Sequence, residues 1–305
     1  DGLTWDPASL VIVDPADGKQ DHNMGMISQV SSGEVIVNNM RLFCNLNAEG
    51  IAKLEGERTV WPDRPTRPFN SIAFDSLYMI RSNDNGHTWG IPQPFGIKSM
   101  TYWSHTGKTG IVELPDGTWL APFQGHAASE EQGLTGGDWE RRDRIYIARS
   151  RDHGRTWGEP STVIYDPEGR ISFHEPPLLR LKSGRLLTVA RTDGADGFVY
   201  QAFSDDDGWT WQGLQRTPMW GHPCNLIELR SGRVLCTYGY RREPYGIRAC
   251  FSDDQGETWD IGREVVLRDD GMHVDLGYPA SIEREDGSIL STYYFHGAAG
   301  IRYIG

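Results

Sequence analysis

The sequence lacks the features that mark membrane-spanning and nucleic-acid-binding proteins. No apolar run approaches the ~20 residues that a transmembrane helix needs, and no charged-then-apolar signal segment opens the chain. Acidic residues outnumber basic ones by 42 to 30, and the net charge of -12 argues against nonspecific binding to nucleic-acid phosphates. Long stretches of helical periodicity are also missing, so we expect very little helix.

Cysteine is scarce and shows no metal-binding pattern. The chain has four cysteines and none of them lies in a CxxC spacing, so we expect no zinc site, no other metal and no cofactor. Cys224, Cys236 and Cys250 fall on successive strands of one predicted sheet. We interpret them as buried free thiols that pack as small apolar residues. A disulfide between neighbouring strands is the alternative.

Glycine and aromatic residues are abundant instead. The chain contains 36 Gly, 11 Trp and 12 Tyr, and its many alternating apolar runs indicate strands separated by tight turns. A length of 305 residues fits two average domains or one large β domain. An internal repeat favours a single domain over residues 1–305.

The repeat is an eight-residue motif with Ser, Asp, Gly, Thr and Trp at fixed offsets. The full copies are SNDNGHTW (82–89), SRDHGRTW (150–157), SDDDGWTW (204–211) and SDDQGETW (252–259), and the opening DGLTW keeps part of the pattern. Ser and Asp side chains can cap the amides of a tight turn, Gly permits the turn and Trp covers neighbouring strands. We therefore interpret the motif as structural rather than catalytic.

A hairpin recurs between the motif copies. Its turn carries Gly after Ser or Asp at Gly33, Gly117, Gly184, Gly232 and Gly287. A third strand precedes each full motif copy and a fourth follows it, which gives four short antiparallel strands per unit. Such units around a central axis form an all-β propeller.

The motif resembles the Asp box of the sialidase (neuraminidase) superfamily, whose members are six-bladed propellers. This resemblance covers the whole chain. It implies a sialidase-like β-propeller with six blades, of which most of blade one precedes Asp1, and it makes a secreted or periplasmic location plausible. Blade one would contribute only an outer strand near residues 9–13. The alternative is a five-bladed ring that this N-terminal strand closes.

The turn glycines also locate a candidate site. Nine residues before them lie Met24, Lys108, Glu175, Pro223 and Tyr278, where each innermost strand begins, and seven residues after them lie Met40, Gln124, Arg191, Gly239 and Tyr294. If each hairpin lines the central funnel, these positions converge at its mouth, opposite the motif copies. Arg, Glu and Tyr side chains from different blades would then share one concave site.

The resemblance also implies roles for matching residues. Glu175, followed 16 residues later by Arg191, matches a sialidase Glu that assists the nucleophile and an Arg that binds the substrate carboxylate. Tyr278 matches the family's nucleophile, and Arg241 or Arg242 matches a further carboxylate-binding Arg. His174 and Lys108 are additional candidates for binding the sugar. The family's Arg-Ile-Pro segment and its Asp acid/base have no counterpart in this sequence.

These residue types suit an acidic sugar. A sialic acid carries a carboxylate on its anomeric carbon, and Arg can bind it through paired, charge-assisted hydrogen bonds. A carboxylate nucleophile would be repelled there, whereas a neutral Tyr activated by Glu would not. The sequence therefore favours an exo-acting glycoside hydrolase for a terminal acidic sugar. The alternatives are a non-catalytic glycan-binding propeller and a polysaccharide lyase acting on a uronic acid through Tyr and His.

Overall fold

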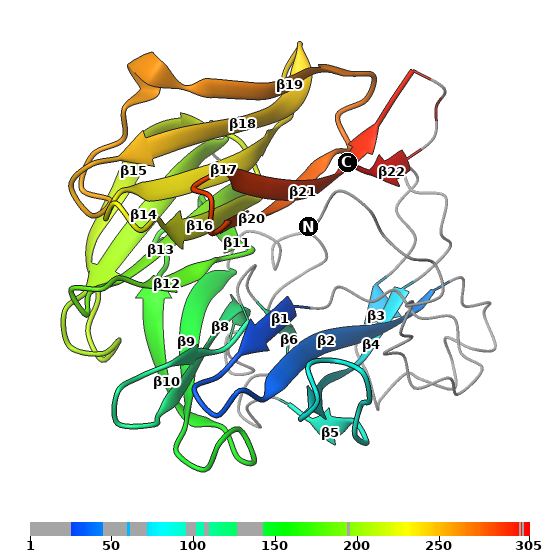
Figure 1. Cartoon of the computed structure of the whole chain (residues 1–305), viewed down its shortest axis with the longest axis vertical. Coiled ribbons are helices and arrows are strands. Elements are labelled where there is room, and N and C mark those ends of the chain that lie inside the picture. The colour runs from blue at the N-terminus through cyan, green and yellow to red at the C-terminus, as the bar shows by residue number, and fades with distance from the viewer. Residues whose placement is uncertain are drawn as a thin grey trace.

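A computed structural model of the chain describes residues 26–44, 60–61, 72–95, 102–106, 110–126, 143–193, 196–298, 300 and 302–305. Their strands form five antiparallel sheets that follow one another around a common centre (Figure 1). The predicted β-propeller with little helix is confirmed, because a single 3-10 turn, η4 (Ile261–Arg263), is the only helical element within these ranges. The described helical residues include no segment long and apolar enough to cross a membrane.

The strand bounds show how regular the sheets are. The first sheet contains β1 (Met26–Gln29), β2 (Val35–Cys44), β3 (Val60–Trp61), β4 (Ile72–Ser82) and β5 (Gln93–Pro94). The second contains β6 (Tyr102–Thr106), β7 (Val112–Glu113), β8 (Trp119–His126), β9 (Arg144–Ser150) and β10 (Gly158–Ile164). The third contains β11 (Ser172–His174), β12 (Leu178–Arg180), β13 (Leu186–Asp193), β14 (Phe198–Ser204) and β15 (Gln212–Trp220). The fourth contains β16 (Cys224–Glu228), β17 (Val234–Tyr240), β18 (Tyr245–Ser252) and β19 (Val265–Gly271), and the fifth contains β20 (Gly277–Glu283), β21 (Ile289–His296) and β22 (Arg302–Ile304).

The number of blades differs from the first expectation. The described residues form five sheets, as the five-bladed alternative requires, and six blades are not confirmed. The strand expected near residues 9–13 lies outside the described residues. The second and third sheets also begin earlier than the repeat suggested, because β6 and β11 precede the innermost strands read from the sequence.

All four motif copies adopt the same hydrogen-bonded turn. In the copy at 204–211, the Gly208 amide donates to Ser204 Oγ at 2.8 Å, while the amide and hydroxyl of Thr210 donate to the Asp206 carboxylate at 2.9 and 2.6 Å. Equivalent bonds from Thr88 and Ser82 lower the pKa of Asp84 to about 2. The structural interpretation of the motif is therefore confirmed.

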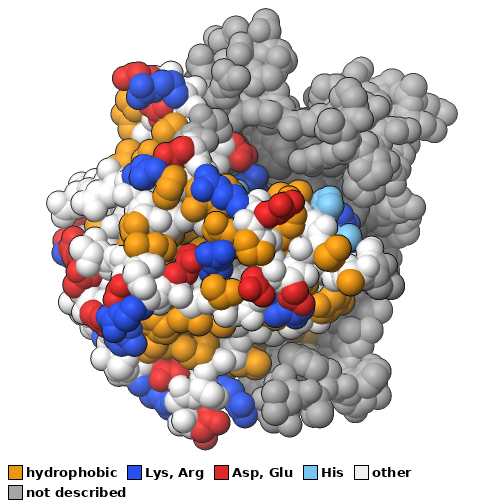
Figure 2. Space-filling view, turned by 90° about the horizontal axis from the view of Figure 1, so that it is seen from above, with side chains coloured by type: hydrophobic (Ala, Val, Ile, Leu, Met, Phe, Trp, Pro, Cys, Tyr) orange, Lys and Arg blue, Asp and Glu red, His pale blue; other side chains and the backbone are white. Residues whose placement is uncertain are grey.

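The core lies between the sheets. One buried cluster joins Leu187 and Val199 of the third sheet to Leu226 and Cys236 of the fourth. Cys224 and Cys250 belong to the same cluster, and all three of these cysteines are buried free thiols, as predicted. On the outer surface, acidic and basic side chains are interspersed with apolar ones (Figure 2).

A carboxylate links successive hairpins at their turns. In each link, a Glu side chain lies four residues before the turn Gly of one hairpin. It accepts a hydrogen bond from the previous hairpin, donated by the backbone N–H two residues before that hairpin's turn Gly. The donor–acceptor pairs are Ser31–Glu113 at 2.6 Å, Lys182–Glu228 at 2.7 Å and Arg230–Glu283 at 2.6 Å. Between the second and third sheets the donor position holds Pro115, which has no N–H, and the acceptor position holds Arg180. Where the donor position has no N–H, the acceptor position has no carboxylate either.

This link predicts a stability difference. Glu228→Ala removes a charged acceptor from the Lys182 amide, so the free energy of unfolding should fall by about 1 kcal/mol. Arg180→Glu is the control, because Pro115 offers no donor and the new carboxylate should bring no gain. Urea unfolding at neutral pH measures both changes. Equal stability of Glu228→Ala and the parent protein would contradict the link.

Candidate active site

The open ends of the hairpins bring the predicted residues together. His174 pairs with Arg191 across β11 and β13, and Gly277 pairs with Tyr294 across β20 and β21. In these sheets, the residues at the start of the innermost strand therefore lie beside the residues at the end of the second strand, as the sequence predicted. Lys108 lies outside the described residues, so the structure does not place it.

Tyr278 and Glu175 form a direct contact between two non-adjacent sheets. The Tyr278 hydroxyl donates a hydrogen bond to Glu175 Oε1 at 2.5 Å. Both residues have left-handed backbone, with φ of 53° and 54°. Non-glycine residues adopt this conformation rarely, and it concentrates at functional sites. The Gln124 side chain supports the pair, because its Oε1 accepts the Glu175 amide proton at 2.5 Å.

A glycine contact sets the position of Tyr278. A Cβ on Gly239 would lie 2.7 Å from the His222 carbonyl oxygen and 2.9 Å from the Cα of Gly277. The fourth and fifth sheets therefore approach too closely for any side chain here. The pairing of β20 with β21 also shifts register between Gly277 and Ala280, which turns Tyr278 out of the regular ladder.

Arg191 is held by two carboxylates. Its Nη1 lies 3.3 Å from Glu175 Oε2, and its Nη2 lies 3.3 Å from Asp193 Oδ1. Burial acts against the charge of Arg191, but Glu175 and Asp193 outweigh it, so the pKa of Arg191 is raised. The Arg191 guanidinium therefore holds Glu175 in place at the candidate site.

Of the two remaining Arg candidates, the structure places Arg241 beside Tyr278. The Arg241 guanidinium lies 5.8 Å from the centre of the Tyr278 ring, and its Nη2 donates to the Tyr294 hydroxyl at 3.3 Å. Arg242 instead stacks on Trp220 at 3.9 Å and donates to the Asp196 carbonyl oxygen. The Tyr294 hydroxyl in turn donates to Asp275, which is also paired with Arg302 at 2.6 Å.

His174 is fixed by its neighbours. Gln124 Nε2 donates to His174 Nδ1 at 3.1 Å, and His174 Nε2 lies 3.5 Å from Asp193. The Gln124 amide nitrogen can only donate, so a neutral His174 carries its proton on Nε2, which faces Asp193 without a hydrogen bond, while Asp143 lies 3.6 Å from Nδ1. His174 therefore lies between two carboxylates, one of which holds Arg191.

The charges of the site control two protonation states. Burial, the charge of Glu175 and its hydrogen bond raise the pKa of Tyr278 well above 10, although Arg191 and Arg241 act in the opposite direction. Burial together with Arg191 and Arg241 lowers the pKa of His222 to about 4. At neutral pH the resting site therefore holds a protonated phenol and an uncharged imidazole.

Sequence reasoning missed Asp193 altogether. The available signal was its place two residues after Arg191, because alternate residues of a strand face the same side. Asp275 and His222 were not among the predicted site residues. Asp275 is bound by Tyr294 and Arg302 of its own sheet, whereas Arg191 acts on His222 from the third sheet, and the repeat pattern indicates neither contact.

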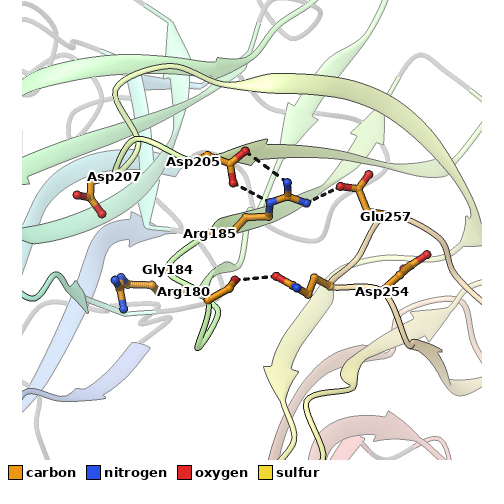
Figure 3. Close-up of a pocket in the computed structure, with 9 residues that line it drawn as sticks. Arg180, Gly184, Arg185, Asp205, Asp207, Asp254 and Glu257 are labelled. Atoms are coloured by element: carbon orange, nitrogen blue, oxygen red, sulfur yellow. Dashed lines mark hydrogen bonds and ion pairs between the residues drawn. The ribbon is translucent and has the colours of Figure 1, made fainter.

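A cavity lies at the opposite end of the propeller from Tyr278, beside the hairpin turns and the motif copies. It has a volume of about 650 Å³ and is lined by Arg180, Arg185 and acidic groups that include Asp205, Asp254 and Glu257 (Figure 3). Arg185 is paired with both Asp205 and Glu257, and Asp254 is bonded within its own motif copy. These contacts satisfy Arg185, Asp205, Glu257 and Asp254, so we assign those four side chains a structural role, while the buried Nε of Arg180 has no partner. Among the side chains that the structure describes, no group of three or more His, Cys, Asp or Glu could hold a metal ion.

Comparison with protein families gives one match. The model of the BNR repeat-like domain matches residues 4–290. A search of the curated proteins found no match.

Solved structures share the fold. A Dyadobacter fermentans protein of unknown function is 25% identical, with a TM-score of 0.74 over 92% of this chain and 74% of that chain. The NanB sialidase of Streptococcus pneumoniae is 13% identical, with a TM-score of 0.58 over 93% of this chain and 58% of that chain. The Penicillium chrysogenum alpha-L-arabinanase is 14% identical, with a TM-score of 0.57 over 91% of this chain and 78% of that chain. The predicted likeness to sialidases is thus shown at the level of the fold.

Because its pKa is raised, Tyr278 should not ionise in an alkaline titration that ionises ordinary tyrosines. Between pH 9 and 11, absorbance at 295 nm should report the same number of ionising tyrosines in the parent protein and in Tyr278→Phe. Glu175→Gln should restore part of the signal, because it removes a negative charge next to the hydroxyl. A full tyrosine lost from this titration in Tyr278→Phe would show that the phenol ionises normally.

Proposed function

Since the chain belongs to the BNR repeat-like domain family, we propose that it is an exo-acting glycoside hydrolase that removes a terminal acidic sugar from a glycan. The observation that carries this proposal is the hydrogen bond from Tyr278 to Glu175 across two non-adjacent sheets. The solved sialidase and arabinanase of the same fold support hydrolysis of glycans, and the chain spans 58% of that sialidase.

Tyr278 acts as the nucleophile in this proposal. Its phenol is uncharged at rest, so it does not repel the carboxylate of an acidic sugar. As its oxygen attacks the anomeric carbon, the phenolic proton passes along the 2.5 Å hydrogen bond to Glu175 Oε1. The reaction thereby avoids free phenolate, which burial disfavours.

Arg191 and Arg241 bind the substrate carboxylate in this proposal. They lie on either side of the Tyr278–Glu175 pair, with Arg241 against the Tyr278 ring and Arg191 against Glu175. An incoming carboxylate displaces Asp193 from Arg191, where the present contact is 3.3 Å. His174 lies against Asp193, and Arg242 and Lys108 stay predicted substrate-binding residues in this proposal.

A labelling experiment tests the nucleophile. A fluorinated sialosyl fluoride slows breakdown of a glycosyl–enzyme intermediate, so peptide mass analysis should find the sugar on Tyr278. Tyr278→Phe should lose both label and turnover of an aryl sialoside by at least ~10⁴-fold, and Glu175→Gln should lower kcat by ~10²–10⁴-fold. Arg233→Gln, near the hairpin turns, is the matched surface control.

Other outcomes identify the competing functions. Binding of acidic sugars without turnover would indicate a glycan-binding propeller. An ultraviolet-absorbing unsaturated product from a uronic-acid polymer would indicate a lyase, for which the uncharged His222 beside two Arg side chains is the favouring observation. Either result would replace the hydrolase proposal.

We also propose that a sixth sheet fits between the fifth and the first. Ile27 on β1 is 69% exposed, whereas Ile111, Leu178 and Leu226 at the equivalent positions are 7%, 1% and 3% exposed. Ile289 on β21 is 38% exposed, whereas its equivalents Trp119, Leu186 and Val234 are at most 1% exposed. These two apolar faces are of the kind that neighbouring sheets cover elsewhere in the fold.

Charge substitution tests the sixth sheet. If another sheet covers these faces, Ile27→Glu or Ile289→Glu should lower the free energy of unfolding by about 2 kcal/mol or more, because each buries an unpaired carboxylate. Ile91→Glu is the control, since Ile91 is 82% exposed and lies between the motif copy at 82–89 and β5. Thermal or urea unfolding of the full protein measures the effect. Unchanged stability of both variants would mean that the faces are open to water.

A further inference from the structure

His222 lies at the same level of the funnel as the Tyr278–Glu175 pair. The residues entering the innermost strands of the third, fourth and fifth sheets are Glu175, His222 with Pro223, and Tyr278. The His222 amide donates to the Gly239 carbonyl oxygen at 2.9 Å, and its own carbonyl lies against Gly277. His222 is therefore held between the sheet of Glu175 and the sheet of Tyr278.

Each of His222 and His174 has one buried ring nitrogen without a hydrogen-bond partner, Nδ1 in His222 and Nε2 in His174. His222 Nδ1 is buried with no hydrogen-bond partner, and its ring packs 5.1 Å from Trp220. The Nδ1 of His174 is instead bound to Gln124. Other buried polar atoms of the described residues also lack a partner. That of His222 belongs to a residue at the level of the Tyr278–Glu175 pair, where a hydrogen-bonding group left unsatisfied in the resting state is a candidate for a role in the reaction.

Charged groups from several elements act on His222. Burial disfavours its charged form most, and Arg191 on β13 and Arg241 after β17 act in the same direction. Asp193 on β13 and Glu175 after β11 favour the charged form. Tyr278, the neighbour on β20, is uncharged at rest. The balance leaves the imidazole neutral, with a pKa of about 4.

We propose that His222 is the catalytic acid of the proposed hydrolysis, and that it gains its proton when the substrate carboxylate binds to Arg191 and Arg241. A carboxylate placed there neutralises the two cations that, in addition to burial, oppose the charge on the imidazole, and it brings a negative charge near the ring. An acidic sugar thus charges the acid that its own cleavage requires. This inference rests on the proposed function.

The proton balance of the two steps is complete. In the first step the Tyr278 oxygen bonds to the anomeric carbon and its proton moves to Glu175. The bond to the leaving oxygen breaks, and that oxygen takes the His222 proton. In the second step water attacks the anomeric carbon and gives a proton to neutral His222, while Tyr278 leaves and recovers its proton from Glu175.

Proton uptake on binding is the direct test. Calorimetry with 2,3-unsaturated sialic acid at pH 5.5, in two buffers of different ionisation enthalpy, should show uptake of about one proton by the parent protein. His222→Gln should bind without uptake. The control His153→Gln, at the hairpin-turn end, should behave as the parent protein does. Absence of uptake in the parent protein, or unchanged uptake in His222→Gln, would overturn the proposal.

Leaving-group dependence separates catalysis from packing. His222→Gln should lower kcat by ~10²–10⁴-fold with an alkyl sialoside, whose leaving oxygen needs a proton, and far less with a nitrophenyl sialoside. Equal losses on both substrates would indicate a structural role and overturn the proposal. Failure of the parent protein to bind or cleave any acidic sugar would instead overturn the proposed function, and this inference with it.

Discussion

The length of the innermost hairpin is the constraint on which the rest of this structure depends. Its turn is closed by the same pair of backbone hydrogen bonds in all five sheets, from Val30 and Gly33 in the first to Arg284 and Gly287 in the fifth. Because strand rise is nearly constant, a fixed number of residues from that turn brings each chain to the same height in the funnel. Residues far apart in the sequence, such as Glu175 and Tyr278, can then meet.

Prediction from the sequence was most successful where copies of the repeat could be compared with one another. Four motif copies and five turn glycines predicted the propeller and the convergence of Glu175, Arg191 and Tyr278, but not β6 and β11 at the start of two sheets. They did not determine the number of blades, because closure depends on contacts between the ends of the fold. The network around Arg191 was also missed. Gln124 reaches it from the second sheet, and His174 meets Arg191 through the pairing of β11 with β13, which the repeat did not predict.

The candidate site is not simply a cluster of unpaired positive charges. Arg191 is already paired with Glu175 and Asp193, and Asp275 is paired with Arg302. The arginines therefore hold the local carboxylates in place while the site is empty. Under the proposed function, a substrate carboxylate would enter by exchange for one of these partners, so its affinity would reflect the difference between two ion pairs rather than a newly formed one.

The left-handed backbone at Glu175 and Tyr278 sets stability against activity at two defined positions. Each residue adopts a conformation that disfavours side chains with a Cβ by about 1 kcal/mol or more, and that glycine accepts readily. Selection for stability alone would drive both positions toward glycine. A lineage that lost the substrate would therefore be expected to lose Glu175 and Tyr278 early, while the turns and Asp boxes that build the propeller persist.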